Sequence, residues 1–450
     1  MNTNSYISIY IHIPFCVRKC NYCDFLSFSA SKDVQDRYLR CLIKEIKCAG
    51  AWLQKPVKSI FLGGGTPSSI EPTWITKILD TIRDSFNVAA DAEITTEMNP
   101  GTVTPESLSI YKKSGINRIS IGCQSLNDDE LKELGRIHDS KTFYETFRAA
   151  REAGFDNINV DLMSALPGQS VSSYTDTLNK IIELRPEHIS AYSLIIEEGT
   201  PFYEKYKDVI DRDIYDIEDE LVKEGIIQNE SDVDTEKKRA EVSISRLEDL
   251  PKPLPTEAQE RQMYEDTIRI LKQNGYHRYE VSNYARNDGN YECYHNKAYW
   301  KRADYLGFGI GAAGMVDDER FTNTDDINIY CEYWDGIDIG ENVTLKGSCS
   351  DKFLQKYSLR PLAEHDKLST KACMEETMFL GLRMDEGVSM SDFNHRFCQS
   401  VMSIYGEVID KLIKNELIVS SDDHLRLTEK GLEISNAVLS KFLLDDKNGE

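Results

Sequence analysis

The sequence predicts an α/β protein in which six βα units curl a parallel sheet into a partial, TIM-like (β/α)6 barrel, followed by a mainly helical, winged-helix-like domain. Short apolar runs rich in β-branched residues alternate with helix-like segments through the first half of the 450-residue chain. Three helical segments, a β pair and a last helix close the second half. In a barrel of this kind, the functional side chains are expected at the carboxyl ends of the strands.

The βα units follow one another in a regular order. The strands are expected at Ser8–Pro14, Ser59–Leu62, Ala92–Glu97, Arg118–Gly122, Asn157–Met163 and His188–Leu194. The helices are expected at Lys32–Ala51, Pro72–Phe86, Pro105–Ser114, Lys141–Ala153 and Val171–Leu184. Pro72 and Pro105 fit the first turn of a helix, and Gly115 and Gly154 fit helix ends.

Composition divides the chain into four parts. Residues 1–205 contain the barrel, 206–255 an acidic insertion, 256–370 a region that covers the barrel, and 371–450 the C-terminal domain. The insertion has few aromatic residues and ends in a proline-rich stretch, which indicates a solvated segment, with partner docking as the alternative. Beyond it, we expect a helix at Thr256–Asn274, a strand and loop at Tyr279–Ala285, helices at Ala372–Arg383, Met390–Phe397, Tyr405–Lys414 and Glu429–Leu444, and a β pair around Leu417–Leu427.

Charge and cysteine content limit the class of protein. The net charge of −23 argues against a nucleic-acid binder, which needs a basic face. No signal-like start and no apolar run long enough to span a bilayer occur, so we expect a cytoplasmic protein. Eleven cysteines then indicate free thiols in a reducing compartment.

Three of these cysteines, Cys16, Cys20 and Cys23, stand in the spacing C-x3-C-x2-C. An odd number of thiols within eight residues suits a soft metal centre better than a disulfide. A zinc site would need a second pair, and none follows at matching spacing. A [4Fe–4S] cluster takes four ligands, so three thiolates leave one iron open for a small molecule. A fortuitous group of core cysteines is disfavoured because the residues between them, such as Arg18 and Asn21, are polar.

Glycine and polar residues follow the strand ends. The run Gly63-Gly64-Gly65-Thr66-Pro67 either lets backbone N–H groups approach a ligand or forms a plain tight turn. Glu97 and Gln124 end two strands; Glu97 could accept ribose hydroxyls or be a capping residue. Asp161 lies inside an apolar strand, which is costly unless it is paired. Arg136 is its candidate partner, or a co-ligand for a carboxylate.

Together these motifs resemble the radical SAM superfamily, in which the open iron chelates S-adenosylmethionine (SAM). The preceding Tyr-x-His-Ile-Pro-Phe resembles the branch of oxygen-independent coproporphyrinogen III oxidase and its relatives. The resemblance covers the first half of the chain and implies a [4Fe–4S] cluster on the three cysteines. It implies SAM contacts from Tyr10, Tyr22, Gly64, Gly65, Thr66, Glu97, Gln124, Arg136 and Asp161.

A second motif, His-Asn-x-x-Tyr-Trp, runs from His295 to Trp300 in what reads as a polar, aromatic-rich loop. A lone histidine is more often structural, but histidine is also a common haem ligand, and the aromatic rings could pack on a macrocycle. The motif resembles the haem-binding motif of HemW-type haem chaperones. The resemblance implies haem binding by His295, Asn296, Tyr299 and Trp300, with Cys293 as a lower-ranked ligand.

The position of Phe25 separates the two families. In the oxidase the cysteine motif continues as C-x3-C-x2-C-x-C, and Phe25 stands where the fourth cysteine would be. We therefore expect a haem chaperone that delivers haem to acceptor haemoproteins, some of them at the membrane, rather than a radical SAM oxidoreductase acting on a porphyrinogen. Oxidase activity is not expected, while SAM cleavage and a homodimer stay open.

The sequence argues against a dinucleotide-binding site and against a DNA-binding regulator. The run Gly309–Gly314 matches G-x-G-x-x-G, but no βαβ unit surrounds it, so we read it as a turn near the barrel mouth. A DNA-binding regulator with an iron–sulfur sensor is disfavoured because the Tyr405–Asn415 segment mixes acidic with basic residues and shows no basic face.

Overall fold

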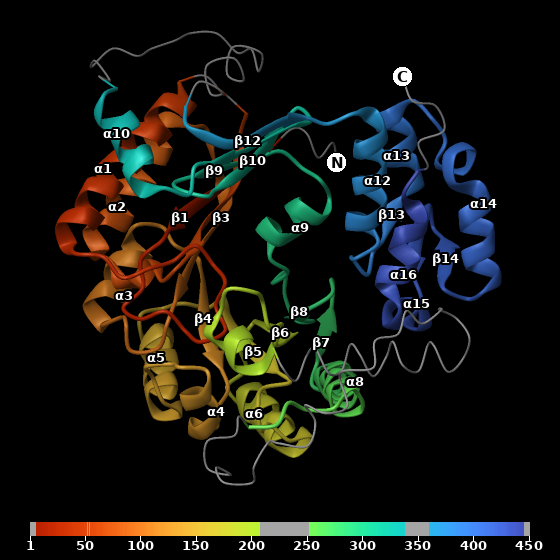
Figure 1. Cartoon of the computed structure of the whole chain (residues 1–450), viewed down its shortest axis with the longest axis horizontal. Coiled ribbons are helices and arrows are strands. Elements are labelled where there is room, and N and C mark those ends of the chain that lie inside the picture. The colour runs from red at the N-terminus through yellow and green to blue at the C-terminus, as the bar shows by residue number, and fades with distance from the viewer. Residues whose placement is uncertain (1–5, 52, 54, 208–251, 338–359, 445–450) are drawn as a thin grey trace, which may run out of the picture.

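The computed structural model describes residues 6–51, 53, 55–207, 252–337 and 360–444. Figure 1 shows a large body built around one sheet, with a smaller, mainly helical domain beside it. The predicted acidic insertion lies almost entirely outside the described residues, and the four-part division of the chain stays a prediction. Within the described residues, no helix is both long and apolar enough to cross a membrane.

The six predicted strands are confirmed, and they lie side by side in chain order as parallel neighbours. They are β1 (Ile7–Ile13), β2 (Val57–Gly64), β3 (Val88–Met98), β4 (Arg118–Gln124), β5 (Ile158–Ser164) and β6 (His188–Ser193). The helices are α1 (Lys32–Gly50), α2 (Pro72–Ser85), α3 (Pro105–Lys113), α4 (Asp128–Glu133), α5 (Ser140–Glu152) and α6 (Val171–Glu183). Of these six helices, the short α4 was not expected.

Residues from the second half of the chain extend this sheet at both edges, which the sequence did not predict. At one edge lie β9 (Tyr305–Phe308), β10 (Ala313–Val316), β11 (Glu319–Asn323) and β12 (Leu362–Lys367), of which β9 runs parallel to β1. At the other edge lie β8 (Asn283–Arg286) and β7 (Tyr276–Arg278). The helix α8 (Glu257–Gln273) packs against α6 and β7, and α10 (Ile327–Asp335) packs against α1. Of these strands, β8 overlaps the strand and loop expected at Tyr279–Ala285. The others have three to six residues, too few for a periodic pattern to reveal them.

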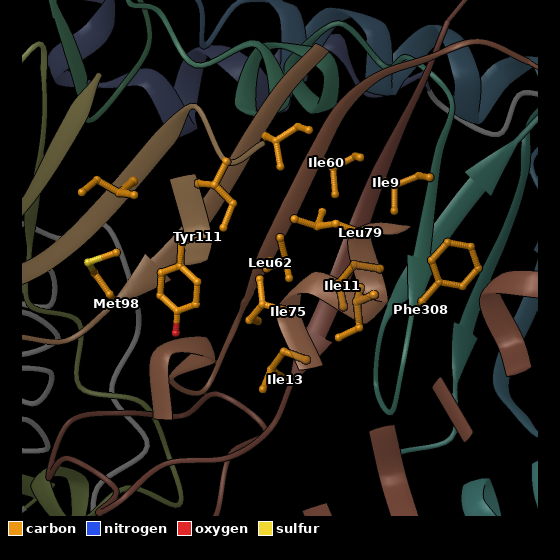
Figure 2. Packing of buried hydrophobic residues seen from close by; sticks show 14 of the residues in the cluster. Ile9, Ile11, Ile13, Ile60, Leu62, Ile75, Leu79, Met98, Tyr111 and Phe308 are labelled. Atoms are coloured by element: carbon orange, nitrogen blue, oxygen red, sulfur yellow. The ribbon is translucent and has the colours of Figure 1, made fainter. Parts of the chain in front are cut away.

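The alternation along β1 decides where the core and the lumen lie. Ile9, Ile11 and Ile13 are buried with Ile60 and Leu62 of β2, and Figure 2 shows this packing. Successive side chains of a strand point to opposite faces, so the intervening polar residues of β1 face the barrel lumen. The lumen is therefore a polar space, and the helix-facing side of the sheet is the apolar core.

The C-terminal domain contains the three predicted helices and a small sheet. It comprises α12 (Thr370–Gly381), β13 (Val388–Ser389), α13 (Met390–Phe397), α14 (Val401–Lys414), β14 (Ile418–Ser421) and β15 (His424–Leu427), with sheet order β13-β15-β14. The single closing helix that we expected is wrong: α15 (Glu429–Glu433) and α16 (Ser435–Leu439) are separated at Ile434, and a 3-10 turn follows at Ser440–Phe442. The break leaves Ile434 exposed, whereas Phe442 beyond it is buried against Tyr405.

The glycine run that we read as a turn follows β9 and packs on a buried carboxylate. Glu45 of α1 is fully buried and accepts hydrogen bonds from Gly309 N–H (2.8 Å), the Tyr330 hydroxyl (2.6 Å) and Arg360 Nη1 (2.7 Å). Gly309 has a φ of +98°, and a Cβ there would overlap the Tyr38 hydroxyl oxygen. Only glycine fits this position without strain.

We expect Gly309→Ala to lower the free energy of unfolding by about 2–4 kcal/mol, because it adds a steric clash to a left-handed backbone conformation. Gly154→Ala is the matched control: its φ is +86°, but nothing lies within 4 Å of an added Cβ. The control should cost only about 1 kcal/mol. Urea unfolding of both variants measures the difference. An equal loss of unfolding free energy in the two variants would contradict the steric clash with Tyr38.

Candidate functional site

A cavity of about 380 Å³ lies at the carboxyl ends of the barrel strands. It is bordered by the loop between β1 and α1, which carries the three cysteines. The predicted residues on its wall are Cys16, Cys20, Cys23, Tyr22, Gly64, Gly65, Thr66, Glu97, Gln124, Arg136 and Asp161. Of the SAM contacts that we expected, Tyr10 alone lies off this wall. The structure thus brings together residues spread over nearly 150 positions of sequence.

The cysteine loop is attached to the barrel by its backbone. Cys16 N–H donates to Phe28 O (3.0 Å), and Asn21 N–H donates to Leu134 O (3.0 Å). Asn21 O accepts in turn from Phe202 N–H (2.9 Å). The loop is therefore positioned by the segments after β4 and β6 without using its thiols.

The three thiols are partly exposed and free of disulfides, and only a free thiol can bind iron. Within the described ranges, no three His, Cys, Asp or Glu side chains converge as the ligands of a single metal ion would. A [4Fe–4S] cluster binds each thiolate on a different iron atom, so its ligands need not converge on one point. The donor set therefore fits a cluster and does not fit a zinc ion.

The glycine turn after β2 joins the cysteine loop to the barrel. Gly65 N–H donates to Ile13 O and Thr66 N–H donates to Phe15 O, both at 2.8 Å. The Thr66 hydroxyl lies 3.4 Å from Cys16 Sγ. A Cβ on Gly65 would come within 2.8 Å of Phe15 O, which explains why this turn needs glycine. The contact of Thr66 with Cys16 makes the turn part of the cysteine site.

Two carboxylates form the floor of the cavity. Burial, aided by the nearby charge of Asp161, raises the pKa of Glu97 to about 8. Burial also raises the pKa of Asp161, although Asn159 and Ser120 donate hydrogen bonds to it at 2.7 and 3.1 Å. Gly64 N–H donates to Glu97 at 3.1 Å. Like charges that share a buried site disfavour ionisation of both, so this floor is prepared for polar or cationic ligand groups.

Arg136 was given two alternative roles, and the structure excludes one of them, because Arg136 does not contact Asp161. Within the described chain, Arg136 donates instead to Asn99 Oδ1 (2.7 Å), Gly122 O (2.5 Å) and Cys20 Sγ (3.7 Å). Asn99 was missed as a site residue. It follows Glu97 by two positions, so the alternation of a strand could have placed it on the same face.

The predicted haem motif does not lie in a loop. Residues Tyr294–Trp300 form the helix α9, which lies between the sheet and the C-terminal domain in Figure 1. Glu93 of β3 explains this helix, because it accepts from the N–H groups of Tyr294 (2.9 Å) and His295 (3.1 Å) in its first turn. A carboxylate at a helix N-terminus satisfies donors that the helix cannot pair itself.

The four motif residues separate into two groups. His295 and Tyr299 face the barrel lumen, where His295 is buried and its Nε2 lies 3.1 Å from the Tyr299 hydroxyl. Trp300 lies under the Arg383 guanidinium of the C-terminal domain, 5.7 Å from ring centre to charge. Asn296 is half-buried. Ser59 of β2 lies beside Glu93 of β3 in the sheet, and both residues contact α9. Glu93 is about 13 Å along β3 from Glu97, so α9 is that far from the cysteine cavity along the strand.

Comparison with known proteins places the chain in a family. A model of the radical SAM superfamily matches residues 10–181, and a model of the HemN C-terminal domain matches residues 368–434. The haem chaperone HemW of Lactococcus lactis is 32% identical over 98% of this chain and 98% of its own length. The chain belongs to the HemW family. The haem chaperone HemW of Bacillus subtilis is likewise 33% identical over 97% of this chain and 99% of its own length.

Membership of the HemW family confirms the resemblance that the sequence motifs indicated, and the radical SAM superfamily implies a [4Fe–4S] cluster and SAM. The coproporphyrinogen III oxidase HemN of Escherichia coli has a similar structure, with a TM-score of 0.72 over 97% of this chain and 90% of that one. The identity is 21%, so this likeness shows the fold alone.

We expect Cys16→Ala, Cys20→Ala and Cys23→Ala each to abolish the brown charge-transfer absorbance of the anaerobically reconstituted protein, because each removes one iron ligand. Cys398→Ala is the control, since Cys398 is an exposed thiol of the C-terminal domain. Iron and sulfide analysis measures the outcome. Full iron and sulfide content in all three variants would refute the cluster site.

The raised pKa of Glu97 predicts a pH effect on stability. Its pKa is about 8 in the folded chain and about 4.3 in the unfolded chain, so the folded state binds the extra proton between these values. The free energy of unfolding should then fall as the pH rises from 5 to 8. The carboxylate is only half-buried, so we expect a fall of about 2 kcal/mol relative to Glu97→Gln. Urea unfolding at several pH values without SAM measures this fall. If the free energy of unfolding depends on pH in the same way in both proteins, the raised pKa of Glu97 is contradicted.

Proposed function

We propose that this chain is a haem chaperone that binds haem and delivers it to acceptor haemoproteins. The observation that carries the proposal is the full-length similarity to proteins named haem chaperone HemW, combined with a histidine-bearing helix at the amino end of the barrel. The chain supplies separate places for the two kinds of ligand. The cysteine cavity lies at the carboxyl ends of the strands, and α9 lies nearer their amino ends.

The cavity residues would hold the cluster and SAM. When bound, these groups supply one-electron reductive cleavage of the SAM sulfonium. Cys16, Cys20 and Cys23 would bind three irons, and the backbone of the glycine turn would approach the amino acid part of SAM. Glu97 at the floor can accept hydroxyl donors, or donate a proton itself when it is neutral. The haem motif lies on α9, outside this cavity, so haem is assigned to another part of the chain.

His295 is the proposed iron ligand. Burial lowers its pKa to about 3, so the ring is neutral at pH 7, the form that binds metals. Cys293 is the weaker candidate, because burial raises the pKa of its thiol to about 12 and iron prefers the thiolate. His295 is buried with both ring nitrogens in hydrogen bonds, so haem binding requires one of these two hydrogen bonds to break. Asn296, Tyr299 and Trp300 would then pack around the macrocycle.

A radical SAM oxidoreductase acting on a porphyrinogen is the second candidate, and the likeness to HemN favours it only through the fold. Phe25 argues against it. This side chain borders the cavity and is 60% exposed, where the oxidase motif would place a fourth thiol. Ile195, at 69% exposed, borders the same opening. Both side chains lie at the cavity with charged residues such as Lys19 and Glu197, and Phe25 has no thiol to give a fourth iron ligand.

Three expectations accompany the proposal. Acceptor haemoproteins at the membrane, a cytoplasmic location and a homodimer each stay a prediction. The absence of a membrane-spanning helix among the described residues is compatible with an acceptor at the membrane, because delivery needs contact and not insertion.

Haem titration of the reconstituted protein tests the function. We expect a Soret band that saturates at one haem per chain and transfer of that haem to an apo-haemoprotein. His295→Ala should weaken binding at least tenfold, because the iron loses its ligand. His277→Ala is the control, since His277 lies on the surface beside Glu292. Absence of haem binding by the intact chain would overturn the function, and unchanged binding by His295→Ala would remove this ligand.

A further inference from the structure

Two hydroxyl groups and one aromatic ring hold the His295 imidazole in a single orientation. Nδ1 lies 2.9 Å from Ser59 Oγ, and Nε2 lies 3.1 Å from the Tyr299 hydroxyl. Phe61 stacks on the imidazole, with ring centres 5.0 Å apart and planes 26° apart. Ser59 and Phe61 both belong to β2, two positions apart, and therefore point into the lumen together.

The directions of these hydrogen bonds assign the tautomer of His295. Ser59 donates its hydroxyl hydrogen to Ser8 Oγ at 2.8 Å. A serine hydroxyl has one hydrogen, so Ser59 Oγ can only accept from the imidazole. Nδ1 of His295 therefore carries the proton. Nε2 carries the lone pair and accepts from the Tyr299 hydroxyl.

This is the state in which histidines bind metals: Nδ1–H bonded to an oxygen and the lone pair on Nε2 directed elsewhere. We propose that Ser59 is a positioning residue that makes Nε2 of His295 the iron-binding atom, and that the Tyr299 hydroxyl caps this atom until haem displaces it. The inference rests on the proposed haem-chaperone function and adds which atom binds and what protects it.

Tyr299 is placed for this capping role by the helix itself. Positions 295 and 299 are four residues apart on α9, so their side chains lie on the same face. The Tyr299 ring is edge-on to His295, with centres 4.9 Å apart and planes at 89°, and packs edge-on against Tyr305 at 4.6 Å. Haem iron and the Tyr299 hydroxyl compete for the lone pair of His295 Nε2. In the haem-free chain, this nitrogen is therefore hydrogen-bonded to Tyr299.

Substitution of the two hydroxyl groups has opposite predicted effects on haem titrations of the full chain. Tyr299→Phe should lower the haem dissociation constant about fivefold, because no hydrogen bond has to break. Ser59→Ala should raise it about tenfold, and Ser59→Thr, which keeps the hydroxyl, should restore it. Tyr305→Phe is the matched control, since its ring packs on Tyr299 and should leave haem binding unchanged.

A second readout is independent of haem. In the haem-free protein, ¹⁵N shifts of the His295 ring should show an unprotonated Nε2, and Ser59→Ala should yield a mixture of tautomers. Weaker haem binding by Tyr299→Phe would make its hydroxyl a haem contact and overturn the cap. An unchanged tautomer and affinity in Ser59→Ala would overturn the positioning role. If His295→Ala alone loses haem, the function stands and this inference falls; if His295→Ala keeps haem, the ligand assignment itself fails.

Discussion

The barrel has a polar lumen whose two ends must each be covered, and this constraint explains most of the rest of the structure. The lumen-facing positions of the strands carry groups such as Glu93, Arg118 and Asp161 instead of aliphatic side chains. Buried polar groups are costly unless they find partners. The cysteine loop covers one end, and α9 closes the other with its first-turn N–H groups on Glu93. The cysteine loop and α9 also carry the residues proposed to bind ligands, so the same segments close the lumen and provide the proposed sites.

The two ends differ in chemistry because they differ in solvent access. At the cysteine end, partly exposed thiols and half-buried carboxylates border an open cavity that a ligand can enter. At the α9 end, His295 is buried against Phe61 and both ring nitrogens are engaged. The first site is preformed. The second has its ligand oriented but covered, which is the arrangement expected of a carrier that must hold its cargo and also release it.

Short-range patterns were enough to predict several parts of the molecule. The spacing of Cys16, Cys20 and Cys23, the glycine turn and the strand-end carboxylate Glu97 were each visible in local sequence, because strand ends of a parallel sheet meet at one edge. Other assignments failed where a distant residue decides the outcome. The alternative in which Asp161 pairs with Arg136 is excluded, because that guanidinium donates to Asn99 and to the Gly122 carbonyl instead. The haem motif became a helix because Glu93, 201 positions before Tyr294, satisfies its N-terminus.

The sequence by itself determined the fold class, the family and the residues around the cysteine cavity, since apolar periodicity and motif spacing are local properties of the chain. Only the tertiary structure decided that later strands extend the sheet on both sides, that Tyr10 lies away from the cavity wall, and that His295 points into the lumen. These outcomes depend on which elements pack together. The tautomer of His295 is the clearest case, because it follows from a hydroxyl on Ser59 whose own hydrogen is held by Ser8.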